Sequence, residues 1–249
     1  MTIAPERVGT AIAASMTNGV KLYGSAGTQV RALDGVDVGF EEGRFTAIMG
    51  PSGSGKSTLL HTMAGLDRLD SGTVHIGDVE LGTLTDRKLT MLRRERVGFI
   101  FQAYNLIPTL SAAENITLPL AIAGTKPDQA WFDHVVDILG LGERLDHRPS
   151  ELSGGQQQRV AAARALVSKP EIIFADEPSG NLDSKSGAEL LEFMRRATRE
   201  MGQTIVMVTH DPLAASFTDR VVFLADGRVV GQTDDPIRLT LSQMKLMGG

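Results

Sequence analysis

The sequence predicts an α/β fold with a mainly parallel β-sheet core. Short apolar runs rich in β-branched residues recur along the 249-residue chain, and segments with helical periodicity separate them. The predicted strands are residues 45–49, 97–101, 172–175, 205–208 and 221–224. The first of these runs leads directly into a glycine-rich turn, and the third leads into two acids. Ligands of such sheets bind at the carboxyl ends of the strands, so we expect a site at that edge.

A mostly helical subdomain is predicted over residues 103–167, inserted into this core. Trp131, Val135 and Ile138 have the i, i+4, i+7 spacing of an amphipathic helix. No internal repeat or long heptad run is visible in the sequence. The pattern therefore indicates a single domain over residues 16–231.

Both ends of the chain are predicted to lie outside this domain. Residues 1–15 are expected to be a flexible tail, and they contain no sustained apolar stretch that resembles a secretory signal. Residues 232–249 are expected to be a short tail with one helix, on which Ile237, Leu241 and Met244 share the face that packs against the domain. The absence of a secretory signal leads us to expect the protein in the cytosol.

Composition excludes several classes of function. The chain has no cysteine, which rules out disulfides and thiolate metal sites. Its net charge of -5 argues against a generally basic surface, so nucleic acid is not the expected partner. The longest apolar runs are strand-sized, whereas a spanning helix needs about 20 apolar residues. We therefore expect any transmembrane path to belong to another chain.

Residues 50–57 read Gly-Pro-Ser-Gly-Ser-Gly-Lys-Ser and match the P-loop pattern between a predicted strand and a predicted helix. Glycines let backbone N–H groups surround a phosphate, and the helix points its positive end at the anion. Lys56 adds a charge and Ser57 a Mg²⁺ ligand. The residues assigned to this nucleoside triphosphate site are Gly50, Ser52, Gly53, Ser54, Gly55, Lys56, Ser57 and Thr58. The motif alone does not choose among NTPase families.

The strand at residues 172–175 ends in Asp176 and Glu177. Carboxylates at the end of a buried strand suit a metal site beside a P-loop. We expect Asp176 to hold Mg²⁺ through water, and Glu177 to polarise the attacking water as a catalytic residue. The pair favours nucleotide hydrolysis over nucleotide binding alone.

Residues 152–159 read Leu-Ser-Gly-Gly-Gln-Gln-Gln-Arg and resemble the signature motif of the ABC ATPases, in its full LSGGQ form. Ser153, Gly154, Gly155 and Gln156 open a predicted helix, so they form a second helix N-terminus that attracts an anion. In that family the signature of one subunit caps the γ-phosphate on the P-loop of the other. The resemblance implies a homodimer that sandwiches two ATP molecules. It also implies the ABC cassette fold, in which an antiparallel β part accompanies the parallel core and helical subdomain.

Other family positions carry over one at a time. Tyr23 matches the aromatic residue that stacks on adenine, although a lone tyrosine is more often plain core or surface. Gln102 resembles the Q-loop residue that reaches Mg²⁺ and the attacking water. His210 resembles the switch histidine that contacts the γ-phosphate. Asp183 ends a segment, residues 179–183, that resembles the D-loop at the dimer interface.

Residues 101–115, 118–120 and 180–183 resemble the ATPases of the MacB, LolD and FtsE group. The resemblance implies a separate integral-membrane permease of the MacB or FtsX type as partner, and a location on the cytoplasmic face of the plasma membrane. Tyr104, Leu106 and Ile107 are either part of the groove for that permease or simply core. The basic run at residues 93–96 is interpreted as a solvated helix end.

Two alternatives concern what the ATPase drives. A soluble ABC ATPase that acts on nucleic acid or ribosomes usually carries two cassettes, a coiled coil or metal-binding insertions, and none is visible here. Within the transporter group, the permease either exports a cargo or transmits a mechanical signal. The ATPase sequence does not separate these two, and it does not name a cargo.

Overall fold

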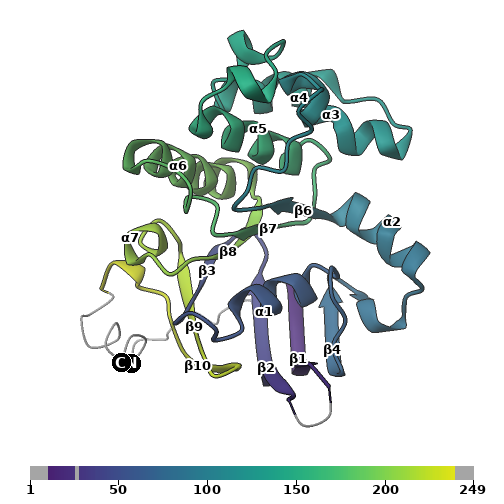
Figure 1. The fold of residues 1–249 in the computed structure, drawn as a ribbon, viewed down its shortest axis with the longest axis vertical. Coiled ribbons are helices and arrows are strands. Elements are labelled where there is room, and N and C mark those ends of the chain that lie inside the picture. The colour runs from purple at the N-terminus through teal and green to yellow at the C-terminus, as the bar shows by residue number, and fades with distance from the viewer. Residues whose placement is uncertain (1–10, 26–27, 239–249) are drawn as a thin grey trace, which may run out of the picture.

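A computed structural model describes residues 11–25 and 28–238, which form two β-sheets and a cap of helices (Figure 1). The strand order is β2-β1-β4-β5 in the four-stranded sheet and β10-β9-β3-β8-β7-β6 in the six-stranded sheet. The strands are β1 (Ile12–Tyr23), β2 (Val30–Glu41), β3 (Phe45–Met49), β4 (Ser71–Ile76), β5 (Val79–Glu80), β6 (Val97–Ile100), β7 (Ile172–Asp176), β8 (Thr204–Val208), β9 (Arg220–Ala225) and β10 (Arg228–Thr233). The α-helices are α1 (Lys56–Met63), α2 (Asp86–Arg96), α3 (Ala112–Ala123), α4 (Gln129–Ile138), α5 (Gly154–Leu166), α6 (Ser184–Met201) and α7 (Pro212–Ala215).

The five predicted strands are confirmed as β3, β6, β7, β8 and β9, with ends that differ by at most one residue. They pair in parallel, and β10 adds an antiparallel edge to β9. The four-stranded sheet is the antiparallel part that the family resemblance implied. The fold class is therefore confirmed.

Side chains along the parallel strands point alternately to the two faces of the sheet, which divides the interior into two hydrophobic layers. In β7, Ile173 and Ala175 join the cluster that includes residues of α5 and α6, whereas Ile172 and Phe174 join the cluster that includes residues of α1 and the antiparallel sheet. Successive side chains of a strand point to opposite faces, so a strand between two layers must be apolar throughout. This is why the predicted strands appear in the sequence as continuous apolar runs.

The helical insertion lies beyond one edge of the parallel sheet, at the top of Figure 1. It contains α3, α4 and α5. The indole N–H of Trp131 on α4 donates to the carbonyl oxygen of Leu166 at the end of α5. Asn115 on α3 is completely buried; its amide donates to three carbonyl oxygens, of Ile107, Leu110 and Ser111, and accepts from the Ile107 N–H. One side chain thus holds the loop that enters the insertion.

The domain boundaries differ from the sequence prediction at both ends. Residues 12–15 belong to β1 rather than to a tail, because Ala13 and Ala14 are buried against the neighbouring elements. Alanine has a low β-propensity, which hid this strand in the sequence. At the other end β10 continues to Thr233, and residues 236–238 form a single 3₁₀ turn in which Ile237 is exposed. Leu241 and Met244 lie outside the described residues.

The longest helix, α6, has 18 residues and is apolar on one side only, with Leu190, Leu191, Met194 and Ala197 buried. Its opposite side carries charged residues that pair along the helix, such as Arg196 with Glu200. Within residues 11–25 and 28–238, no helix combines the length and the apolar character needed to cross a bilayer.

The bonds of Asn115 lead to a stability prediction. Asn115→Ala leaves four backbone groups of the 107–111 loop without that partner, so we expect the free energy of unfolding to fall by about 2–4 kcal/mol. Urea denaturation followed by circular dichroism measures the change. Ile122→Ala on the same helix is the control, because Ile122 is exposed and its loss should change stability by less than about 0.5 kcal/mol. Equal stability of the two variants would contradict the role of Asn115.

Candidate active site

The turn between β3 and α1 has room for glycine only at two of its positions. A Cβ atom on Gly50 would lie 2.0 Å from the Leu224 carbonyl oxygen, and one on Gly55 would lie 2.2 Å from the Ala32 carbonyl oxygen. Gly55 also has a φ of 98°, in the region that favours glycine. The hydroxyl of Ser54 is buried and has no hydrogen-bond partner among the described residues. The turn is therefore a tight cradle that precedes the N-terminus of α1, the geometry that binds phosphate.

Lys56 lies at the start of α1 and is 8% exposed. Its ammonium donates to the Pro51 carbonyl oxygen at 2.7 Å, so it folds over the turn. Burial lowers the pKa of Lys56, while the carboxylates of Glu177 and Asp176 oppose that shift. The sequence-predicted lysine and both acids thus lie in one electrostatic neighbourhood.

Ser57 and Asp176 come together from two elements. The Ser57 hydroxyl on α1 donates to Oδ1 of Asp176 at the end of β7, at 3.1 Å. Nε2 of His61, one turn further along α1, lies 3.5 Å from Oδ2 of the same carboxylate. A hydroxyl beside a carboxylate fits Mg²⁺, which prefers oxygen ligands and takes the rest from water and phosphate. No group of three or more His, Cys, Asp or Glu residues that could hold a metal occurs in the described part of the chain, so an all-protein metal cage does not fit.

Glu177 and His210 meet at the same edge of the sheet. Nδ1 of His210, which follows β8, lies 3.0 Å from Oε1 of Glu177. Glu177 has a φ of 44°, a left-handed conformation that costs a non-glycine residue roughly 1–2 kcal/mol. Its N–H donates to the Val208 carbonyl oxygen at 3.0 Å, which extends the pairing of β7 with β8 by one residue. The sheet itself therefore fixes where this carboxylate stands.

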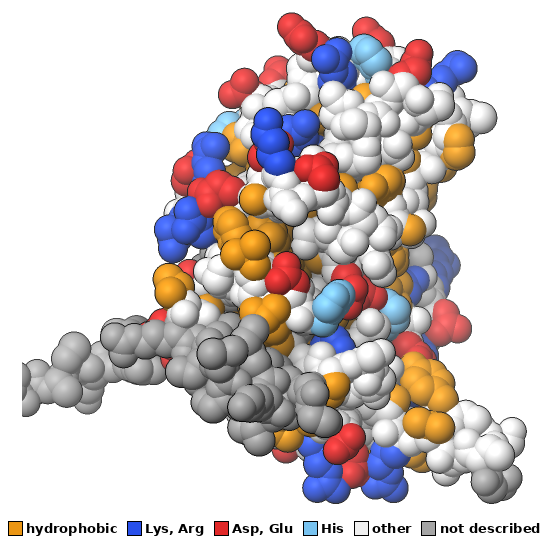
Figure 2. Space-filling model, turned by 60° about the vertical axis from the view of Figure 1, so that its left-hand side comes forward, with side chains coloured by type: hydrophobic (Ala, Val, Ile, Leu, Met, Phe, Trp, Pro, Cys, Tyr) orange, Lys and Arg blue, Asp and Glu red, His pale blue; other side chains and the backbone are white. Residues whose placement is uncertain are grey.

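A cavity of about 640 Å³ joins these groups. It is lined by Tyr23, Val30, Ala32, Ser52, Gly53, Gly55, Lys56, Ser57, Thr58, Glu177 and His210. Figure 2 shows histidine and acidic side chains next to one another near the middle of one face of the molecule. Val30 and Ala32 were not identified from the sequence, although residues two apart on a strand share one face and alternation along residues 30–41 could have indicated them.

Tyr23 lines this cavity and is held by groups that do not line it. Its hydroxyl donates to Oδ2 of Asp67 at 2.7 Å, and the Lys21 ammonium pairs with Oδ1 of the same carboxylate at 2.8 Å. Burial and the Asp67 hydrogen bond raise the pKa of Tyr23, so its phenol is neutral near pH 7. Asp67 was also missed, because it is distant in sequence and matches no local pattern.

The signature residues do not line this cavity. Ser153 caps α5: its hydroxyl accepts from the Gln156 N–H, and Oε1 of Gln156 accepts from the Ser153 N–H. Gly154 and Gly155 form the first turn, where a Cβ would meet Tyr104 and Ser186 respectively. The segment is thus an ordered helix N-terminus on the helical subdomain, apart from the P-loop cavity of the same chain.

Gln102 and Asp183 also lie outside the cavity lining. Gln102 follows β6 and is exposed, and its carbonyl oxygen accepts from Nδ2 of Asn181 at 3.1 Å. The Asp183 carboxylate caps α6, accepting from the N–H groups of Lys185 and Ser186 and from the Ser186 hydroxyl. These bonds hold the pKa of Asp183 below its usual range. One chain therefore assembles the P-loop, Asp176, Glu177, His210 and Tyr23, and leaves the other predicted residues at its margins.

Comparisons with known proteins agree with this arrangement. The family profile described as "ABC transporter" matches residues 33–180. The bacitracin export ATP-binding protein BceA of Halalkalibacterium halodurans is 46% identical over 218 residues, which cover 87% of this chain and 86% of that protein. The macrolide export ATP-binding/permease protein MacB of Marinobacter nauticus is 45% identical over 213 residues, 85% of this chain and 33% of that protein.

A solved structure has the same fold. The dimeric structure of a post-hydrolysis state of the ATP-binding cassette MJ0796, bound to ADP and Pi, superposes with a TM-score of 0.80 at 40% identity, covering 89% of this chain and 98% of that one. The family match over residues 33–180 spans the P-loop, the two acids and the signature segment. The chain therefore belongs to the ABC transporter family and is an ABC ATPase.

Proposed function

We propose that this chain binds and hydrolyses ATP to drive a separate integral-membrane permease, of the type that partners the MacB, LolD and FtsE group. One observation carries the proposal: the P-loop, Glu177 and His210 line a single cavity, and Asp176 bonds to Ser57 of that lining, while the signature helix begins elsewhere. The similarity to BceA and to the cassette part of MacB supports export as the driven process. The cassette drives either transport of a cargo or a mechanical signal.

The residues of the site have distinct proposed roles. The backbone of residues 50–58 and the Lys56 ammonium bind the phosphates, and Tyr23 stacks on the adenine. Ser57 and Asp176, with Gln102 at the margin, hold Mg²⁺, which supplies positive charge against the phosphate oxygens. The neutral phenol and its anchor on Asp67 suit stacking, since the ring is oriented before nucleotide arrives.

Glu177 is proposed as the group that orients and polarises the attacking water. His210 holds the Glu177 carboxylate through its Nδ1. Because Nδ1 faces Glu177, Nε2 on the other side of the ring is the nitrogen left to contact a phosphate oxygen.

The site is proposed to be completed by a second copy of the chain. Ser153, Gly154, Gly155 and Gln156 present a helix N-terminus that attracts anions, yet they do not line the cavity of their own chain. A head-to-tail pair places this N-terminus, with Asp183 nearby, against the partner's nucleotide. The dimeric cassette MJ0796 supports this arrangement.

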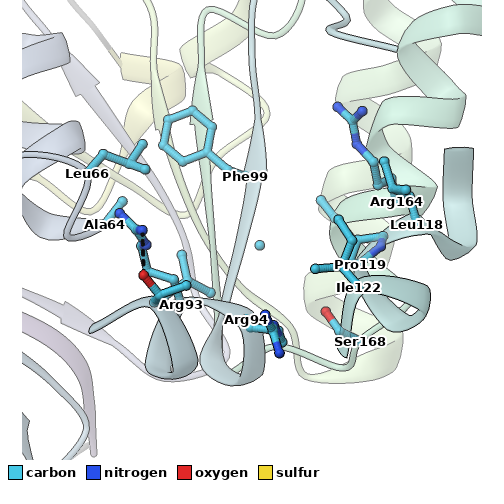
Figure 3. Close-up of a pocket in the computed structure, with 14 residues that line it drawn as sticks. Ala64, Leu66, Arg93, Arg94, Phe99, Leu118, Pro119, Ile122, Arg164 and Ser168 are labelled. Carbon is cyan, nitrogen blue, oxygen red and sulfur yellow. Dashed lines mark hydrogen bonds between the residues drawn. The ribbon is translucent and has the colours of Figure 1, made fainter. Parts of the chain in front are cut away.

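A groove between the core and the helical subdomain is the proposed contact with the permease. It has a volume of about 470 Å³; Ala64, Leu66, Arg93 and Phe99 lie on one wall and Leu118, Pro119, Ile122 and Arg164 on the other (Figure 3). Arg93 and Arg94, from the basic run interpreted as a solvated helix end, lie in the last turn of α2 and line this groove. Tyr104, Leu106 and Ile107 do not line it.

Arg164 links this groove to the segment after Gln102. Its guanidinium donates to the carbonyl oxygens of Asn105 and Tyr104, at 2.6 and 3.0 Å. A permease segment bound in the groove would therefore act, through Arg164, on the segment that follows Gln102. Attachment to such a permease places the protein on the cytoplasmic face of the plasma membrane.

Glu177→Gln tests the hydrolytic role. The amide keeps the shape of the side chain but does not polarise water, so we expect phosphate release to fall at least about a hundredfold while ATP binding persists and a dimer accumulates. A phosphate-release assay and light scattering after gel filtration measure these outcomes. Glu171→Gln, the same change at the other end of the β7 segment, should leave both unchanged. Unchanged hydrolysis in Glu177→Gln would show that Glu177 does not polarise the attacking water.

Lys56→Ala tests the binding role. Loss of a charged donor to the phosphates should weaken ATP binding by about tenfold or more. Calorimetric titration with MgATP measures this, and Lys169→Ala, at an exposed lysine remote from the cavity, is the control. If the Lys56 variant binds ATP as the wild type does, the P-loop assignment is wrong.

Ile122→Glu tests the groove. Ile122 is 63% exposed, so the charge should not disturb folding, but it would oppose an apolar segment in the groove. In the Glu177→Gln background with ATP, gentle purification from native membranes should recover a permease with a few spanning helices, and Ile122→Glu should abolish this. Val230→Glu is the matched control, since Val230 is equally exposed but lies on β10. Recovery of ribosomes or DNA-repair proteins without a membrane protein would overturn the transporter proposal.

A further inference from the structure

Three consecutive glutamines open the signature helix, and each has a different task. Oε1 of Gln156 accepts from the Ser153 N–H, within the cap of α5. Nε2 of Gln157 donates to the Leu152 carbonyl oxygen, just before the helix. Gln158 is 0% exposed and turns away from both, because successive helix residues are about 100° apart. It is the member of the trio that reaches the interior of the domain.

The Gln158 amide joins two strand ends. Nε2 donates to the carbonyl oxygen of Phe101 at 3.2 Å and to that of Pro178 at 2.8 Å. Phe101 directly precedes Gln102, and Pro178 directly follows Glu177. Because both partners are acceptors, only the NH₂ side of the amide satisfies them. A single side chain thus fixes the positions from which both active-site residues depart.

The oxygen atom of this amide, in contrast, has no bonding partner that explains its burial. Oε1 of Gln158 is buried and has no hydrogen-bond partner among the described residues. An unpaired buried carbonyl is unfavourable, and an apolar side chain of similar volume would avoid that cost. Such a side chain would also leave the Phe101 and Pro178 carbonyl oxygens without this donor, so the two donated bonds are what distinguish Gln158 from a core methionine or leucine.

The two joined segments also touch each other. Nδ2 of Asn181 donates to the carbonyl oxygen of Gln102, and a Cβ on Gly180 would lie 3.1 Å from Nε2 of Gln102. The Gly180 N–H donates to the Glu177 carbonyl oxygen at 3.0 Å. The chain around Gln102 and the chain around Glu177 therefore form one hydrogen-bonded unit, and Gln158 ties that unit to α5.

We propose that Gln158 is a positioning residue for ATP hydrolysis: it couples the signature turn at residues 153–156 to Gln102 and Glu177 of the same chain. The proposal rests on the roles proposed above for those two residues. A displacement of the first turn of α5, where the partner's nucleotide binds in the proposed dimer, moves the backbone just before Gln102 and the backbone just after Glu177. Gln158 touches no nucleotide and acts through the loops that it holds.

Gln158→Met tests this, with Gln157→Met as the matched control one residue earlier on the helix. Methionine retains the volume and removes both donated bonds. We expect kcat for ATP hydrolysis to fall about tenfold in Gln158→Met, with the ATP KM changed less than about twofold, because the P-loop is untouched. Gln157→Met should keep the wild-type kcat.

Hydrogen exchange measured by mass spectrometry gives a second readout that does not depend on catalysis. In Gln158→Met the amides of residues 101–105 and 179–183 should exchange faster together, while those of β8 keep their protection. Wild-type exchange in either segment would overturn the proposal. So would a variant with a lowered Tm but wild-type kcat well below that Tm, which is the outcome of a merely structural role.

Gln158→Asn serves if the methionine variant does not fold. Its amide remains polar, but the shorter side chain reaches at most one of the two carbonyls, so the same effects should appear at smaller size. Wild-type kcat and exchange in that variant would also overturn the proposal. Failure of the proposed function is distinguishable, since it appears as absent ATP hydrolysis in the wild-type chain, whereas the exchange measurement reads the coupling directly.

Discussion

The register of the parallel strands β3, β8 and β7 is the constraint on which the site depends. Ile48 of β3 pairs with Val208 of β8, and Val208 pairs with Asp176 of β7, so these strands end at one level. The pairing continues beyond the strands, with Thr209 N–H bonded to the Ile48 carbonyl oxygen and Glu177 N–H to that of Val208. A slip of one residue would turn every side chain to the opposite face. It would separate the cradle, the acids and the histidine in the same step.

This constraint explains how far the sequence could predict the molecule. Strands buried on both faces must be apolar throughout, so β3, β7 and β8 were visible as runs, and the residues that follow each run had to meet at one edge. The P-loop glycines were equally readable, since Gly50 and Gly55 face backbone oxygens that exclude any side chain. Features of the site that depend on strand ends and on local steric limits can therefore be predicted from short stretches of sequence.

Other features depend on contacts between distant segments and were not readable. The beginning of β1 was taken for a tail because alanines signal no strand until a sheet covers them. The groove that Arg93 and Arg94 line was not readable either, because nothing in the local sequence indicates its opposite wall. The anchor of Tyr23 on Asp67 and the bonds of Gln158 join positions far apart in sequence. For such pairs a single sequence shows which residues are present but does not show that they are in contact.

The tie between Trp131 and the end of α5 has a consequence for spectroscopy. Trp131 is the single tryptophan of the chain, and its indole N–H is bonded to the Leu166 carbonyl oxygen within the helical subdomain. Intrinsic tryptophan emission from this protein therefore originates in one subdomain and from one microenvironment. The Lys169 ammonium lies 5.3 Å from the centroid of the Trp131 ring, so the fluorophore also has a fixed positive charge beside it. Tryptophan fluorescence therefore reports on the helical subdomain that bears the signature helix, and the P-loop core contributes none of it.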